Sequence, residues 1–157
     1  MSASSERFSL DTNLLVYAID TRAGIRHELA KRIIERAARC DCWLTLQAVS
    51  EFYSVVTRKR VLPREEAGAQ AADWLVLFPC AAVSASSVRT ALAEATAGRA
   101  SYWDALLVAT AGEAGCTVLL TEDLTDGADF GGVRIHNPFS PSGELNQLAC
   151  RLLALDD

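Results

Sequence analysis

Four acidic positions stand inside segments of this chain that are otherwise apolar. In chain order they are Asp11, Glu51, Asp104 and the adjacent pair Glu122 and Asp123. An ionised carboxylate beside a hydrophobic core is costly unless a cation or hydrogen bonds compensate its charge. Because such positions recur through one short chain, we expect a shared compensator, and a divalent metal that prefers oxygen ligands is the simplest one. The pattern predicts metal-dependent chemistry on a phosphodiester.

Each acid, taken alone, also has a purely structural interpretation. Asp11 stands directly before a helical segment and can be its N-cap, and Asp104 is the last residue of an S-x-x-D capping pattern. Glu51 can pair with Arg58 on the same helix, and Asp123 can be solvated in an acidic loop. A cap holds its carboxylate rigidly, so the first two interpretations are compatible with a metal site.

The segments that carry these acids alternate between predicted strands and predicted helices. Apolar runs predict strands at 7–11, 43–46, 80–83, 117–120 and 133–135. Helical periodicity predicts helices at 14–18, 24–39, 48–59, 64–77, 86–97 and 102–114. This alternation indicates a single α/β domain in which helices flank a mostly parallel sheet.

The predicted topology brings the acids to one edge of the sheet. Asp11 and Asp123 follow predicted strands, and ligands of open parallel sheets bind outside the carboxyl ends of the strands. Glu51 and Asp104 lie in early turns of helices that begin near that edge. We therefore expect all four acids to converge.

Composition limits the class of protein. The chain has 157 residues, half of them hydrophobic, and a formal net charge of −5. It contains no apolar run of the roughly 20 residues that span a bilayer, and its polar N-terminus lacks the apolar core of a signal peptide. We expect a soluble, cytoplasmic protein with no membrane partner. Five scattered cysteines without a CxxC pair favour buried free thiols over a zinc site.

The negative net charge at first argues against a nucleic-acid partner. Basic residues nevertheless gather in two runs, at 22–39 and at 58–64. Arginines around a metal-loaded acidic pocket can hold a phosphate backbone, and the same runs can equally be ordinary solvated helix faces.

Four segments in combination resemble the PIN-domain ribonucleases, particularly the VapC-type toxins of toxin–antitoxin pairs. The segments are SLDTNLLVYA, QAVSEFYSVV, SYWDALLVATA and LLTEDLTDG, the last followed by VRIHNPF. The likeness covers about residues 7–139, so we expect a nuclease domain at 1–139 and a helical extension of that domain at 140–157. It implies a PIN-like three-layer sandwich and an endoribonuclease that needs Mg²⁺ or Mn²⁺. It also implies an RNA substrate, a homodimer and a cognate antitoxin.

The resemblance assigns roles to individual residues. The catalytic acids would be Asp11, Glu51, Asp104 and Asp123. Asp11, Asp104 and Asp123 would hold the metal, and Glu51 would bind it directly or through water. Asn13 and Thr121 would orient water or carboxylates around the site. Glu122 and Asp126 compete with Asp123 for the fourth position.

Two alternative functions and one segment remain open. The acids can form a PIN-like module that binds RNA or protein without cleaving it. A phosphatase that forms an aspartyl-phosphate at Asp11 is disfavoured, because Asn13 stands where a second aspartate is needed. Residues 142–155 show the periodicity of an amphipathic helix, which can pack on its own domain or dock onto another subunit.

Overall fold

The structure is a computed structural model that describes residues 6–155. The expectation that the N-terminus carries no targeting segment falls mainly on residues 1–5, which lie outside the described part. In chain order the elements are β1 (Phe8–Leu10), α1 (Thr12–Ile19), the 3-10 turn η1 (Thr21–Ala23), α2 (Ile25–Ala37), β2 (Leu44–Thr45), α3 (Leu46–Arg58), α4 (Arg64–Leu77), β3 (Cys80–Ala81), α5 (Ala85–Thr96), α6 (Tyr102–Glu113), β4 (Val118–Leu120), β5 (Asp129–Phe130), β6 (Val133–His136) and α7 (Gln147–Leu152).

A mostly parallel sheet forms the centre of the molecule. Its strand order is β1-β4-β6-β5, in which β1, β4 and β6 are parallel and β5 pairs antiparallel with β6. The short parallel pair β2-β3 is joined to β1 by a bridge between Phe8 and Cys42. The α/β prediction is confirmed, whereas β5 was not predicted because two residues show no alternation that a sequence pattern can detect.

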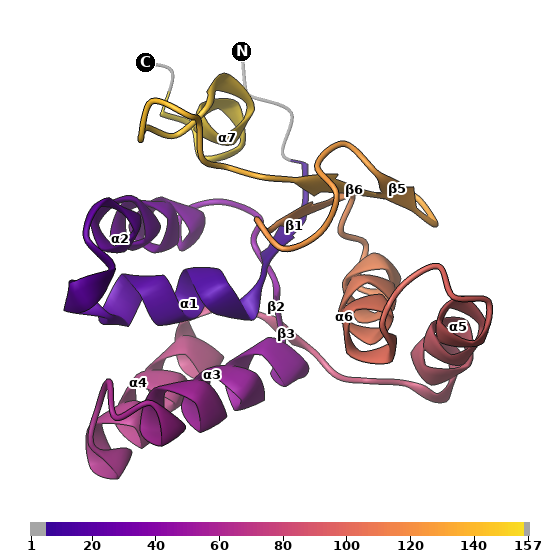
Figure 1. Ribbon diagram of the computed structural model, residues 1–157, viewed down its shortest axis with the longest axis horizontal. Helices are drawn as coiled ribbons and strands as arrows, with labels where there is room; N and C mark the ends of the chain where they lie inside the picture. The colour runs from indigo at the N-terminus through magenta and orange to yellow at the C-terminus, as the bar shows by residue number, and fades with distance from the viewer. Residues whose placement is uncertain (1–5, 156–157) are drawn as a thin grey trace.

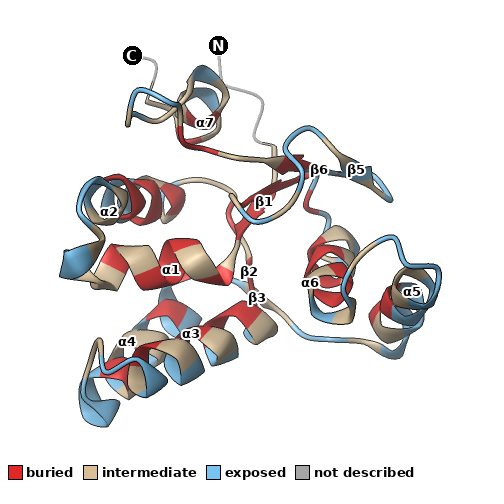
Figure 2. Cartoon of the chain, viewed as in Figure 1, coloured by how far each residue is buried: buried red, intermediate tan, exposed pale blue. Residues whose placement is uncertain are grey.

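Helices cover the sheet from both sides, as Figure 1 shows. The helices α1, α2, α3 and α4 lie to one side of β1, and the paired helices α5 and α6 lie to the other. Figure 2 shows that the buried residues line the strands and the inward faces of the helices. Leu10, Leu119 and Ile135 are fully buried on neighbouring strands. The core therefore lies directly beneath the carboxyl edge of the sheet, where the acids are expected. No helix between residues 6 and 155 is both long enough and apolar enough to cross a membrane.

The C-terminal segment is a shorter helix than its periodicity predicts. Leu145 forms an antiparallel bridge with Phe139, and Asn146 caps the helix by accepting a hydrogen bond from the amide of Ala149 at 3.0 Å. These contacts delay the start of α7 to Gln147. Leu153 is fully buried in the main core, so this segment packs on its own chain.

Candidate active site

Asp11 connects the end of β1 to the start of α1. One carboxylate oxygen accepts a hydrogen bond from the amide of Thr12 at 2.7 Å, which makes Asp11 the N-cap of α1 as predicted. The other oxygen accepts from the hydroxyl of Thr121 at 2.6 Å. The backbone amide of Asp11 also donates to the carbonyl of Leu120 at 3.0 Å. The carboxylate is therefore fixed from both the helix and the neighbouring strand.

The environment of Asp11 opposes its negative charge. Burial, which is the largest cause, and the nearby carboxylate of Asp123 together raise the pKa of Asp11 to about 6, even though the hydrogen bonds from Thr121 and Thr12 act in the opposite direction. An acid whose ionised form is penalised by burial and by a second acid gains most from a bound cation. The unfavourable ionised form of Asp11 is the uncompensated charge that the sequence predicts at this position.

Asp123 is held beside Asp11 by two residues. Its backbone amide donates to the hydroxyl of Thr121 at 3.1 Å, and its carboxylate accepts from the side-chain amide of Asn13. The Thr121 hydroxyl thus donates to one acid and accepts from the backbone of the other, and its side chain is almost completely buried. The structure places both predicted supporting residues, Asn13 and Thr121, in contact with the acids.

Glu51 lies in the second turn of α3, next to the Asp11 cap. One of its oxygens accepts from the hydroxyl of Thr12 at 3.1 Å, and the other accepts from the side-chain amide of Gln47 at 2.9 Å. Within the described residues it forms no ion pair, so the alternative pairing with Arg58 is not observed. Glu51 is oriented by neutral donors that leave its charge uncompensated.

Asp104 lies in the first turn of α6, and its side chain forms no hydrogen bond or ion pair within the described residues. Its backbone amide donates to the hydroxyl of Ser101 at 3.2 Å, which makes Ser101 the N-cap of α6. The side-chain amide of Gln47 donates to the carbonyl of Trp103 at 3.0 Å and so links α3 to the start of α6. Across residues 6–155 no three acidic, histidine or cysteine side chains are grouped closely enough to hold a metal together. Asp11 and Asp123 form the central pair, Glu51 is joined to it through Thr12, and Gln47 links Glu51 to Trp103, the neighbour of Asp104.

The two competing acids are bound elsewhere. Glu122 accepts from the hydroxyl of Tyr17 and forms an ion pair with Arg26 at 3.2 Å. Burial, together with the hydrogen bond to Glu122, raises the pKa of Tyr17 to about 12. Asp126 accepts from the amide of Asn137 at 2.9 Å and lies 3.5 Å from a ring nitrogen of His136.

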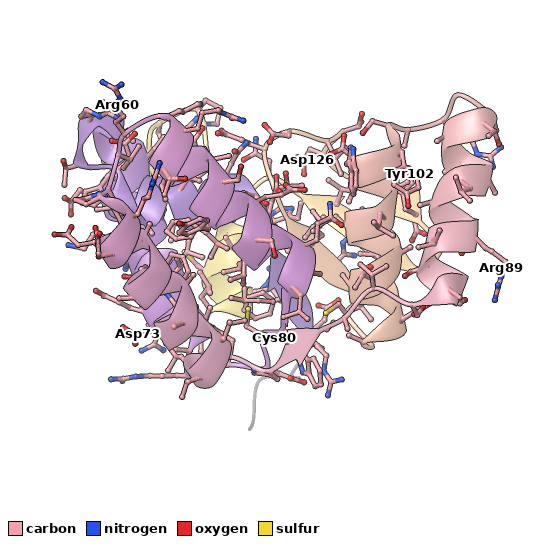
Figure 3. All side chains as sticks on the ribbon, turned by 90° about the horizontal axis from the view of Figure 1, so that it is seen from below. Arg60, Asp73, Cys80, Arg89, Tyr102 and Asp126 are labelled. Atoms are coloured by element: carbon pink, nitrogen blue, oxygen red, sulfur yellow. The ribbon has the colours of Figure 1, made fainter. Side chains whose placement is uncertain are left out.

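Figure 3 labels residues on opposite margins of the molecule. Asp126, after β4, and Tyr102, at the start of α6, lie along its upper edge, whereas Cys80 at the start of β3 lies toward the lower edge. Arg60, at the end of the α3 segment, lies on the same upper margin. The carboxyl edge of the sheet is therefore the one that carries the acids.

The two basic runs differ in their surroundings. In the first, Arg26 pairs with Glu122, and Arg36 donates to the backbone carbonyls of Leu153 and Ala154, at 3.1 and 2.7 Å. In the second, the side chains of residues 58–60 are exposed and form no ion pair within the described chain. The first run is at least partly structural, and the second is free to meet a charged ligand.

Sequence comparison decides the family. A sequence model described as the PIN domain matches residues 9–125, which contain Asp11, Glu51, Asp104, Glu122 and Asp123. The chain belongs to the PIN-domain family. The resemblance expected from the motifs is confirmed, and the matched region ends before α7 begins. No curated protein sequence matches this PIN domain.

Solved structures similar to this PIN domain include a toxin and toxin–antitoxin complexes. The toxin VapC20 of Mycobacterium tuberculosis, described as cleaving the sarcin–ricin loop, has a TM-score of 0.62 and 21% identity over 81% of this chain and 98% of its own. VapBC2 of Rickettsia felis, bound to a fragment of its promoter DNA, has a TM-score of 0.60 and 16% identity over 83% and 98%. A toxin–antitoxin complex from Klebsiella pneumoniae has a TM-score of 0.59 and 23% identity over 83% and 97%. At these identities the likeness shows that this PIN domain shares their fold.

Several residues that shape the site carry no sequence signal of their own. Thr12, Gln47 and Tyr17 are neutral, and neutral residues do not stand out in an apolar segment as acids do. Gln47 precedes Glu51 by one helical turn, which is the spacing of side chains that touch on a helix. That spacing is the one signal that could have identified Gln47.

Proposed function

We propose that this PIN domain is a metal-dependent endoribonuclease and the toxin of a toxin–antitoxin pair. The observation that carries the proposal is the pair Asp11 and Asp123, held together by Thr121 at the carboxyl edge of the sheet. The ribonuclease activity is supported by the family and by the RNA-cleaving toxin of the same fold. The antitoxin is supported by the complexes in which related folds occur.

The donor set fits Mg²⁺ or Mn²⁺. Mg²⁺ is commonly bound by one or two carboxylates and retains several waters, so two adjacent acids are sufficient. Asp11 and Asp123 would hold the ion, Asp104 would complete the set from α6, and Glu51 would bind directly or through water. The penalty on the ionised form of Asp11 is the observation that favours a cation at this position.

The chain's own residues would do the positioning. A bound divalent cation supplies a water of lowered pKa and neutralises charge that develops on the phosphate. Thr121 and the cap of α1 fix the direction of the Asp11 carboxylate, and Asn13 fixes that of Asp123. Glu51, which Thr12 and Gln47 orient through hydrogen bonds, would accept a proton from a water at the site.

The remaining parts of the proposal concern the whole protein. The exposed basic residues 58–60 would contact RNA phosphates, since they lack ion pairs in the described chain and Arg60 lies on the margin that carries the acids. We include in the proposal a cytoplasmic homodimer with a nuclease domain at 1–139 and an extension of the same domain at 140–157. A metal-free, non-cleaving RNA- or protein-binding module is the alternative.

An RNA cleavage assay with Mg²⁺, Mn²⁺ or EDTA tests the activity. We expect cleavage that EDTA stops, and loss of cleavage in Asp11→Asn and Asp104→Asn variants that keep the circular dichroism spectrum of the native fold. Asp73→Asn, an exposed acid on α4, is the matched control and should cleave normally. Full activity in purified Asp104→Asn protein, or undiminished activity in EDTA, would contradict the proposal. RNA binding without cleavage would favour the non-catalytic alternative.

A further inference from the structure

A pocket of about 620 Å³ opens directly beside the acids. Its walls include Leu46, Gln47 and Glu51 of α3, Val83 of the segment before α5, and Trp103 and Leu106 of α6. Small-molecule sites typically have volumes of about 300–1,000 Å³, so the pocket is large enough for a ligand group. Because Glu51 is part of its wall, whatever enters the pocket also reaches the carboxylate of Glu51.

The pocket wall is largely apolar and contains an exposed aromatic ring. Trp103 is 63% exposed although the buried residues 105–108 of α6 follow it closely, and Val83 and Leu46 are 43% and 39% exposed. Of the described residues on this wall, Glu51 is the one charged group, and it is negative. A phosphate would therefore be repelled, whereas a flat uncharged ring would be accommodated.

Gln47 adds an unpaired hydrogen-bond acceptor. Its side-chain nitrogen donates to Glu51 at 2.9 Å and to the carbonyl of Trp103 at 3.0 Å, which fixes the amide group. Its side-chain oxygen is buried and has no hydrogen-bond partner among residues 6–155. Buried polar atoms are almost always paired, so this oxygen indicates a missing donor.

We propose that the pocket receives one unstacked nucleobase of the RNA substrate. The indole of Trp103 stacks on the face of the base, and the oxygen of Gln47 accepts a hydrogen bond from an N–H on its edge. Proteins recognise single-stranded RNA by splaying bases onto aromatic side chains and bonding to their edges. The base would occupy the pocket while the backbone phosphate of the same nucleotide lies at the acids, because Glu51 belongs to both parts of the site. This inference rests on the proposed ribonuclease function and identifies its substrate as unpaired RNA.

A mutant cycle that combines protein variants with modified RNA substrates tests the contact between Trp103 and the base. The protein forms are wild type, Trp103→Ala, Trp103→Phe and the control Leu92→Ala, which removes an exposed side chain on α5. The substrates are an oligoribonucleotide that wild-type protein cleaves and versions with an abasic sugar at each position around the cut. We expect Trp103→Ala to lower kcat/KM roughly 5- to 150-fold on the intact RNA, which corresponds to the usual strength of base stacking on an aromatic ring. Trp103→Phe should recover most of this loss.

The same cycle identifies which nucleotide of the RNA places its base in the pocket. At one position the abasic RNA should be cleaved equally by wild type and Trp103→Ala, because the ring has nothing to stack on. Leu92→Ala should match wild type on every RNA. If the losses from Trp103→Ala and from each abasic site simply multiply, the base pocket is overturned while the ribonuclease function stands.

A binding measurement separates failure of the pocket from failure of the proposed function. In an Asp11→Asn background, short homopolymeric oligoribonucleotides should quench the fluorescence of exposed Trp103 but not that of buried Trp74, and oligomers of abasic sugars should not. Quenching by intact RNA without any cleavage by wild type would support the pocket and overturn the nuclease. If neither quenching nor cleavage is observed, both the base pocket and the nuclease function are overturned. A smaller native mass in Trp103→Ala would assign this surface to contact between copies of the chain and overturn the pocket.

Discussion

Asp11 combines a structural task with its proposed catalytic one. It caps α1 and at the same time faces Asp123 in a partly buried position. The pKa of Asp11 is about 6 in the fold against an ordinary aspartate value of 3.8, so folding takes up a proton between these pH values. The stability that the protonated form contributes is full below about pH 3.8 and is lost as the pH rises through about 6.

This linkage predicts the pH dependence of an Asp11→Asn variant. In EDTA above pH 6, the variant should be more stable than wild type by up to about 3 kcal/mol, because it has no charge to bury. The difference should shrink as the pH falls toward 4. Thermal or urea unfolding of both proteins across this pH range measures it. Parallel stability curves would show that burial and Asp123 do not disfavour the ionised form of Asp11.

RNA cleavage should be as sensitive to substitution of Thr121 as to substitution of the acids that Thr121 joins. Thr121→Val keeps the shape but removes the hydroxyl, which leaves an oxygen of Asp11 and the amide of Asp123 without this partner. We expect a loss of about 1–3 kcal/mol in unfolding free energy and a marked loss of RNA cleavage. Thr121→Ser keeps the hydroxyl and is the control. Normal activity in the valine variant would contradict a positioning role.

The acids could be selected from the sequence because a charged residue within an apolar run is conspicuous, whereas Thr121 was assigned through the family resemblance. Asp11 and Asp123 are brought together as expected, and Thr12 and Gln47 bring Glu51 next to them. The sequence could not rank Asp123 over Glu122, since the two are adjacent. Their difference depends on Tyr17 and Arg26, which lie about a hundred residues earlier and bind Glu122 only in the folded chain.

At the level of elements, the segment around α7 illustrates where sequence patterns fail. Its apolar periodicity predicts a helix over 142–155, but periodicity does not reveal that Leu145 pairs with Phe139 instead. The long helices were predicted well: α4 begins and ends at the residues expected from Pro63 and Pro79. Sequence signals such as proline therefore predicted the helices that have clear ends. Where an element depends on contacts between distant residues, as around α7, the sequence pattern did not predict its bounds.

Leu153 tests how firmly this segment belongs to its own chain. It is fully buried in the main core, and the backbone carbonyl of Leu153 accepts from Arg36. Leu153→Ala should lower the unfolding free energy by about 2–5 kcal/mol without changing the native mass. Val76→Ala, at a side chain that is 89% exposed on α4, should change stability by no more than about 0.5 kcal/mol. A change in native mass with unaltered stability would instead indicate that α7 docks onto another subunit.

At the level of the whole molecule, a bound cation should stabilise the fold. Mn²⁺ or Mg²⁺ added at pH 7.5 should raise the Tm of wild type in a concentration-dependent way, because a ligand of the native state shifts unfolding by mass action. The shift should shrink below about pH 6, where protons compete for Asp11. Asp11→Asn should show little shift, and Asp73→Asn should behave as wild type. Equal shifts in all three proteins would place the cation elsewhere.

The pairing of β1 with β4 has a consequence for the time at which activity first arises. Thr121 reaches Asp11 across 110 residues of sequence, and the acids occupy both ends of that interval. A nascent chain that still lacks β4 has Asp11 but no Asp123 beside it. The ribosome must therefore complete most of the polypeptide before the proposed centre exists, and prematurely terminated chains should be harmless to RNA.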